Sequence, residues 1–240
     1  MFPVYIGFDS REAVAFDVCR HSLVTRSSTP IDVHCLRQNT LRQLGLYRRA
    51  AVVKHGRRFD VTDGKPFATE FSFTRFLVPA LCKHEGWALF CDCDFLFVAD
   101  VTELVPMMDD AKAVLVCKQL HAPTEVSKMD GCVQQCYPRK NWSSFMLFNC
   151  GHRAVQRLTV DAVNERPGAW LHGFEWLRDD EIGELPPAWN WIDGVTDSSP
   201  KAIHYTAGGP WFPDRAMVPF AQEWRDAYAQ AYGNPWQEAA

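Results

Sequence analysis

Two aspartates interrupt an otherwise apolar run in the first half of the chain. The run reads LFCDCDFLF over residues 89–97, and its two acids are Asp92 and Asp94. Burying a carboxylate without a partner is costly, and two neighbouring carboxylates also repel each other. Because side chains alternate along a strand, both acids are predicted to point to the same side. Two hard oxygen ligands so placed favour Mg²⁺ or Mn²⁺, which would also bind a diphosphate. The alternative is a strand that ends at Asp92, with both acids solvated in a turn.

A histidine in the second half is a candidate third ligand. His204 ends a short apolar stretch within the segment AIHYTAGGPW, residues 202–211. The glycine pair Gly208 and Gly209 has no side chains, so its backbone amides are able to approach a phosphate closely. A histidine in such a place also packs or hydrogen-bonds as a structural residue, and that second interpretation stays open.

Strand and helix patterns alternate along the chain. We predict strands over residues 4–8, 31–36, 87–98, 113–116 and 145–148, and helices over residues 11–24, 71–81, 101–108, 152–164 and 219–232. Asp9 followed by Glu12 is typical of a capping pair at a helix start. The alternation predicts an α/β sandwich with a mostly parallel sheet, in which ligands bind beyond the carboxyl ends of the strands. We expect one domain over residues 1–240, with a nucleotide-binding half over 1–98 and an acceptor-side half over 99–240.

Composition and charge exclude several classes of protein. The chain has 240 residues, a formal net charge of -4 and no long basic run, which argues against a nucleic-acid partner. The N-terminus lacks the pattern of a signal peptide, and no apolar stretch is long enough to span a bilayer. We therefore expect no transmembrane segment and a cytoplasmic location, where the nine cysteines would be reduced. A zinc site built from Cys117, His121, Cys132 and Cys136 is a weaker alternative, because the spacing matches no common zinc motif.

Short motifs in a consistent order resemble the family-eight glycosyltransferases, a group that includes glycogenin and bacterial lipopolysaccharide galactosyltransferases. The matching segments are Ile6-Gly7-Phe8-Asp9, Thr74-Arg75-Phe76-Leu77-Val78-Pro79, Asp92-Cys93-Asp94, Phe148-Asn149-Cys150-Gly151, Asp179-Asp180-Glu181-Ile182, Leu185-Pro186-Pro187-Ala188-Trp189-Asn190, and His204-Tyr205 with Gly208 and Pro210-Trp211. The Asp-x-Asp and the final His-Gly-Pro-Trp pattern together are the most specific part of the resemblance.

The resemblance implies a GT-A fold and a metal-dependent transfer of a sugar from a nucleoside-diphosphate sugar, with UDP as the expected nucleotide. The acceptor would be a carbohydrate or glycoconjugate, and the anomeric configuration would be retained. Asp92, Asp94 and His204 would bind Mn²⁺ or Mg²⁺, which acts as a Lewis acid on the leaving diphosphate. Asp179 and Asp180 would act as the catalytic carboxylates that stabilise charge in the transition state. The donor would contact Phe8, Asp9, Arg11, Arg75, Asp92, Asn149, Gly208, Gly209 and Trp211.

Two positions depart from the pattern of that family. Gly209 stands where the family has a lysine before Pro-Trp, so Arg11, Arg75 or Lys140 would supply the positive charge. Asp180 stands near the family's central glutamine, and it would serve either as a nucleophile or as an acceptor for a sugar hydroxyl. Asp9 would either bind the nucleoside or only cap the following helix.

Two other classes of function remain open from the sequence. One is a metal-dependent phosphohydrolase or nucleotidyltransferase that also uses an Asp-x-Asp, although such phosphohydrolases carry the motif on their first strand. The other is a non-catalytic module that binds a nucleotide-sugar or a glycan. Donor hydrolysis without an added acceptor would distinguish an enzyme from such a module.

Overall fold

A six-stranded sheet forms the centre of the structure, a computed structural model that describes residues 1–118, 139 and 141–237. β1 pairs in parallel with β2 and β5, and β7 pairs in parallel with β9. β8 runs antiparallel to both of its neighbours, β5 and β7. The prediction of an α/β fold with a mostly parallel sheet is confirmed. The strands, in their order across the sheet, are β2 (Ile31–Leu36), β1 (Phe2–Gly7), β5 (Trp87–Cys91), β8 (Phe145–Asn149), β7 (Val114–Val116) and β9 (Ile182–Glu184).

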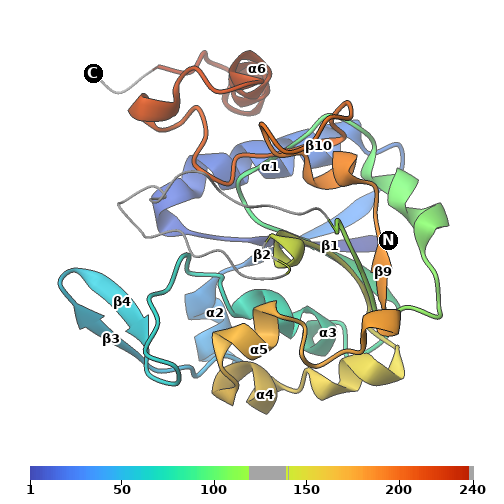
Figure 1. Cartoon of the computed structure of the whole chain (residues 1–240). Coiled ribbons are helices and arrows are strands. Elements are labelled where there is room, and N and C mark those ends of the chain that lie inside the picture. Colours follow the sequence, from blue (N-terminus) through green and yellow to red (C-terminus); the bar gives the residue numbers. More distant parts are fainter. Residues whose placement is uncertain (119–138, 140, 238–240) are drawn as a thin grey trace.

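Helices cover both faces of this sheet, as Figure 1 shows. One face carries α1 (Ala13–Arg26), with α6 (Ala221–Tyr232) beyond it; the other carries α2 (Gln38–Gln43), α3 (Val78–Leu81), α4 (Val160–Glu165) and α5 (Gly168–His172). A second apolar cluster joins α1 and α6 through buried side chains that include Val18, Leu96 and Trp224. Within the described residues, no helix is long and apolar enough to cross a membrane.

The single strand predicted over residues 87–98 is wrong. β5 ends at Cys91, and β6 (Phe95–Phe97) instead pairs with β10 (Ala202–His204) in a separate two-stranded sheet. Asp92 and Asp94 therefore lie at a turn between two buried strands and do not alternate along one strand. Both flanking runs are apolar because each packs into the interior, and the change of partner strand is not visible in that pattern.

Three predicted helices are shorter or tighter than expected. The segment over 71–81 forms a 3₁₀ turn at Thr74–Leu77 followed by α3, and Pro79 is tolerated because the first helical turn needs no N–H there. The segment over 152–164 is divided into a 3₁₀ helix at Arg153–Arg157 and α4. The segment over 101–108 is a 3₁₀ helix, Val101–Met107, that contains Pro106.

A β-hairpin projects beside the helices α2 to α5 (Figure 1). It pairs β3 (Ala51–Lys54) with β4 (Arg57–Asp60), and its two-residue turn has positive φ at His55 and Gly56. At its base, Arg49 makes a fully buried ion pair of 2.6 Å with Asp60. Arg49 also donates to the backbone carbonyls of Val163 and Arg166, which anchors the hairpin to α4.

Candidate functional site

Asp92, Asp94 and His204 form a cluster at the carboxyl end of β5. Their potential ligand atoms all lie within 4.8 Å of one another. The side chains of Asp92 and Asp94 are only 13% and 14% exposed, and that of His204 is 2% exposed. The alternative correctly placed both acids at a turn after the strand, but they are largely buried and not solvated.

The chain holds this turn from both sides through backbone hydrogen bonds. The amide of Asp92 donates to the carbonyl of Ser144 at 3.0 Å, and the amide of Tyr205 donates to the carbonyl of Asp94 at 3.0 Å. The antiparallel register pairs His204 directly with Phe95, so the imidazole lies next to Asp94. His204 and Asp94 are distant in sequence, and the β6–β10 pairing is what brings them together.

The tautomer of His204 follows from the hydrogen bonds of Asn190. The amide nitrogen of Asn190 donates to the carbonyl of Asn141 and to Ser144 Oγ, both at 3.1 Å. Its Oδ1 is therefore the acceptor for His204 Nδ1 at 2.8 Å. This leaves the lone pair of Nε2 directed at Asp94 Oδ1, 3.4 Å away. A histidine oriented in this way by a neighbouring amide is typical of a metal ligand.

Arg75 is the buried cation beside this cluster. Its Nη1 lies 2.8 Å from Asp92 Oδ1 and donates to the carbonyl of Ser143 at 2.7 Å. Its guanidinium also lies 5.1 Å from the ring centroids of Phe71 and Phe90. Arg75 thereby places a fixed positive charge at the site, as the resemblance to the family implies.

Glu12 is a third carboxylate at the site, and sequence analysis assigned it only to helix capping. It is 1% exposed, and its Oε1 has no hydrogen-bond partner among the described residues. Its Oε2 accepts from the thiol of Cys93 at 3.6 Å. Burial, together with the negative charges of Asp94 and Asp9, raises the pKa of Glu12 to about 8. Glu12 joins the cluster because the segment after β1 packs against the turn at Cys93. No local sequence pattern predicts that contact.

A buried serine and a half-buried histidine border the cluster on the other side. Ser143 Oγ lies 2.8 Å from His172 Nδ1. Burial, followed by the charge of Arg75, lowers the pKa of His172 to about 3, so the ring is neutral at physiological pH. The same ring bonds to the backbone of Ser72, which leaves Nδ1 as the acceptor for the serine proton. The Ser143 hydroxyl therefore offers only acceptor capacity to any ligand.

One cavity with a volume of about 790 Å³ is lined by Asp92, Asp94, His204, Arg75, Glu12, Ser143 and His172. The cavity also receives Arg11 and Thr206, an apolar wall that includes Phe67, Phe73 and Phe174, and the end of α5. A space of this size suits a ligand of the size of a nucleotide-sugar. The acidic cluster occupies one part of the cavity, so a cation and an anionic ligand would fit together there.

The residues predicted to contact the nucleoside mainly contact other groups of the protein. Asp9 is fully buried and accepts from the backbone amides of Arg11 and Glu70 and from the guanidinium of Arg11. It caps the 3₁₀ turn Ser10–Glu12, as one of the two interpretations predicted. Phe8 is buried, with the guanidinium of Arg37 3.6 Å from its ring centroid, and it does not line the cavity. Arg11 does line the cavity.

Asn149 lies at the wrong end of its strand for the predicted contact with a donor. In the antiparallel β5–β8 pair, Asn149 is opposite Trp87, whereas Phe145 is opposite Cys91 and next to the acidic turn. The amide of Asn149 donates to the carbonyl of Lys112 instead. The residues of this segment that reach the cavity are Asn141, Ser143 and Ser144, just before β8.

Asp179 and Asp180, predicted to be the catalytic carboxylates, are not brought to the cluster. Their side chains are 88% and 71% exposed, and neither residue lines the cavity. Asp179 pairs with Arg139, and Asp180 pairs with Arg178 at 3.0 Å. Both carboxylates are thus paired with arginines at the surface, away from the cluster.

The glycine pair and Trp211 serve packing in this structure. Gly208 has a φ of +104, and a Cβ on Gly209 would lie 2.1 Å from the ring of Trp211. Trp211 packs against Tyr205 and Trp224 in the second apolar cluster. Gly208, Gly209 and Trp211 do not line the cavity, so the geometry does not place them at the predicted contacts with the donor.

Several predictions fall on residues outside the described part of the chain. His121, Cys132, Cys136 and Lys140 are among them, so neither the zinc alternative nor the charge of Lys140 is placed. Cys117 is described, and its buried thiol lies 3.3 Å from the carbonyl of Pro186.

The fold is that of the GT-A glycosyltransferases. The bifunctional glycosyltransferase WbbM superposes with a TM-score of 0.62 at 17% identity, over 98% of this chain and 51% of that one. The galactosyltransferase LgtC, in complex with donor and acceptor sugar analogs, has a TM-score of 0.60 at 14% identity, covering 95% and 96%. GlyE of Streptococcus pneumoniae TIGR4 has a TM-score of 0.58 at 15% identity, covering 95% and 60%. The chain thus spans about half of the WbbM chain and 60% of the GlyE chain.

A sequence relative gives the family. Protein CDI of Arabidopsis thaliana is 44% identical over 230 residues, which cover 93% of this chain and 84% of that protein. The chain therefore belongs to the family of Protein CDI. No model of a known protein family matches the sequence.

Proposed function

We propose that this protein is a divalent-cation-dependent glycosyltransferase that uses a nucleoside-diphosphate sugar. The observation that carries the proposal is the buried cluster of Asp92, Asp94 and His204 inside a cavity of about 790 Å³ in a GT-A fold. Two carboxylates and a histidine whose Nε2 lies 3.4 Å from Asp94 Oδ1 offer a ligand set that fits Mn²⁺ or Mg²⁺. Burial and the charges of Asp94 and Asp9 raise the pKa of Glu12 to about 8, and a cation bound beside it would favour release of that proton.

The side chains have separate roles in this proposal. Asp92, Asp94 and His204 bind the cation, and Asn190 keeps His204 in the required tautomer. A bound Mn²⁺ or Mg²⁺ would supply Lewis acidity toward the diphosphate. Arg75 adds positive charge from the protein, which compensates in part for the missing lysine at Gly209.

The oxygen of Ser143 is suited to accept a hydrogen bond from a hydroxyl group of the sugar. Its proton is held by His172, so the oxygen faces a ligand as a pure acceptor.

UDP as the nucleotide and retention of configuration follow from the resemblance to family eight and belong to the same proposal. The described carboxylates that line the cavity are Glu12, Asp63, Asp92, Asp94 and Glu175.

Incubation with UDP-sugars in the presence of Mn²⁺ tests this proposal directly. We expect release of UDP above the rate without protein, and we expect chelation by EDTA to abolish it. The anomeric configuration of the product, read by proton NMR, decides between retention and inversion. Binding of nucleotide without any turnover would favour the non-catalytic module, and consumption of simple phosphate esters would favour the phosphohydrolase.

A further inference from the structure

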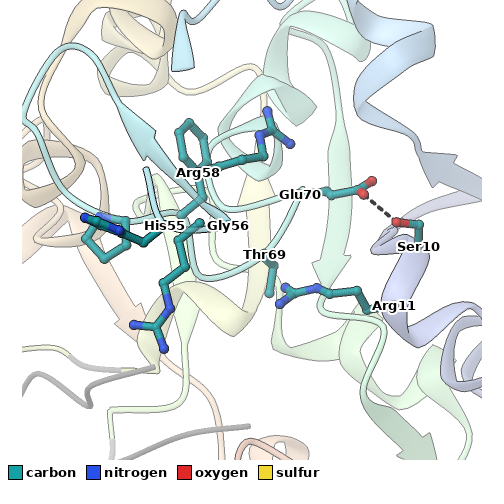
Figure 2. Close-up of a pocket in the computed structure, with 10 residues that line it drawn as sticks. Ser10, Arg11, His55, Gly56, Arg58, Thr69 and Glu70 are labelled. Atoms are coloured by element: carbon teal, nitrogen blue, oxygen red, sulfur yellow. Dashed lines mark hydrogen bonds between the residues drawn. The ribbon is translucent and has the colours of Figure 1, made fainter. Parts of the chain in front are cut away.

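A second, smaller pocket of about 470 Å³ opens beneath the tip of the β3–β4 hairpin. Figure 2 shows side chains from three segments around it: the hairpin tip, the turn after β1, and the segment before the 3₁₀ helix at Thr74–Leu77. Its described lining residues are Ser10, Arg11, His55, Gly56, Arg57, Arg58, Pro66, Phe67, Thr69 and Glu70. None of the functional roles given above involves the hairpin tip.

This pocket adjoins the cavity of the acidic cluster. The residues that line both spaces are Arg11, Arg57, Pro66, Phe67 and Thr69. A ligand long enough to enter both would have one end near Asp92 and Asp94 and the other beneath the hairpin. The smaller pocket is therefore an extension of the proposed active site.

The electrostatic character changes between the two ends of the cavity. Asp92, Asp94 and Glu12 gather at the inner end, whereas arginines dominate the lining under the hairpin. Glu70 is the one acidic side chain among the described residues that line the smaller pocket, and it accepts from Ser10 Oγ (Figure 2). The pocket thus keeps a formal excess of positive charge, although the whole chain carries -4.

Arg58 is held in place by neutral partners. Its Nη2 donates to Gln38 Oε1 at 2.9 Å, and its guanidinium lies 5.1 Å from the ring centroid of Phe67. The amide nitrogen of Gln38 donates to the carbonyl of Glu70 at 2.7 Å, which fixes the orientation of the amide. These partners order the arginine without neutralising it, so its charge remains able to act on a ligand.

The hairpin that carries these cations is anchored at its base. The turn at His55 and Gly56 has positive φ at both residues, which is typical of a tight type I′ hairpin. The buried pair of Arg49 and Asp60 holds the other end of the hairpin.

We propose that this pocket binds an anionic group, a phosphate, sulfate or carboxylate, on the acceptor of the transfer reaction. The inference rests on the proposed function, because the acceptor hydroxyl would lie toward the acidic cluster while the anion lies under the hairpin. Arg57 and Arg58 supply the charge, and Phe67 supplies a flat apolar surface for a sugar ring.

Binding of glucose 6-phosphate, compared with glucose, tests the inference by isothermal titration calorimetry. The protein is held at saturating Mn²⁺ and UDP, so the nucleotide site is filled before the probe is added. We expect the phosphate to bind at least about tenfold more tightly than glucose, since charge-assisted hydrogen bonds are its main additional contacts. We expect Arg58→Gln to remove most of that preference and to leave binding of UDP with Mn²⁺ unchanged, because Arg58 lines only the smaller pocket. Arg57→Gln should weaken the preference too, and it covers the case in which Arg58→Gln does not fold.

Lys54→Gln is the matched control, because Lys54 lies on the same hairpin but does not line the pocket. It should retain the preference within about twofold. The inference is overturned if glucose 6-phosphate binds no better than glucose, if Lys54→Gln loses as much as the arginine variants, or if the probe binds only when UDP is left out. The last outcome would assign the pocket to the nucleotide. Loss of UDP binding in the unmodified protein would instead contradict the proposed function itself.

Discussion

Replacing Glu12 with glutamine is expected to stabilise the metal-free protein, and the gain should grow with pH. Burial, with the neighbouring charges of Asp94 and Asp9, raises the pKa of Glu12 from 4.5 to about 8. At about 1.4 kcal/mol per pKa unit, the full penalty for ionising this carboxyl in the folded state is about 5 kcal/mol. Glutamine is of similar size and keeps an oxygen that accepts from the thiol of Cys93.

The sign follows from proton binding in the two states. The unfolded chain releases the proton of Glu12 near pH 4.5, whereas the folded protein keeps it until about pH 8. Stability is therefore lost as the pH rises between these two values. The loss amounts to about 1 kcal/mol at pH 5 and about 4 kcal/mol at pH 8, and glutamine avoids both.

Urea unfolding at pH 5 and pH 8, in EDTA, measures this difference. The free energy of unfolding of Glu12→Gln should exceed that of the unmodified protein by about 4 kcal/mol at pH 8 and by about 1 kcal/mol at pH 5. Glu175→Gln is the control, because Glu175 lines the same cavity but is exposed, and it should change little at either pH. An equal gain at both pH values, or a loss at pH 8, would refute the reasoning.

Three further variants test other parts of the structure. Asp60→Asn leaves the charge of Arg49 buried, so it should lower the free energy of unfolding by about 3–5 kcal/mol in urea titrations. Gly209→Ala places a Cβ 2.1 Å from the ring of Trp211, and it should lower the melting temperature by several degrees. His172→Asn should make the free energy of unfolding fall less steeply as the pH is lowered. The unfolded histidine binds a proton below about pH 6.5 while the folded one, with a pKa of about 3, does not, so stability is lost as the pH falls through this range.

Each of these variants has a control elsewhere in the chain. Asp161→Asn removes an exposed partner of Arg48 and should hardly change the free energy of unfolding. Gly151→Ala meets only ordinary contacts of 3.7 Å and longer, so its melting temperature should hardly move. His55→Asn removes an exposed imidazole and should leave the acid profile unchanged. Effects as large in the controls as in the test variants would contradict the three explanations.

The sequence was sufficient for the fold class and for the residues of the cluster. Asp92 and Asp94 stood out because carboxylates are rare within an apolar run, and the structure brings them together with His204. The geometric reason given for their proximity was wrong, since a turn and not strand alternation places them. The local pattern records that both flanks are buried, but it does not record that β6 leaves β5 to pair with β10.

The errors at the edges of the site have a common physical origin. Asn149 matched a motif by its order along the chain. Because β8 runs antiparallel to β5, Asn149 lies opposite Trp87, at the end of β5 that is far from the acidic turn. Glu12 and His172 were missed because their importance comes from contacts with Cys93 and Ser143, far away in sequence. Burial of a charged group and register between strands depend on the whole fold, so neither can be derived from a short motif.

Mn²⁺-dependent binding of UDP, measured by thermal shift and by calorimetry, tests the central claim most directly. The unmodified protein should gain stability from UDP only when Mn²⁺ is present, because a ligand that binds the native state raises the melting temperature. Asp94→Asn should abolish this gain while the protein remains folded, and Asp110→Asn, at an exposed aspartate outside the cavity, should keep it. An unchanged response to Mn²⁺ and UDP in Asp94→Asn would contradict the account of the cluster as a metal site.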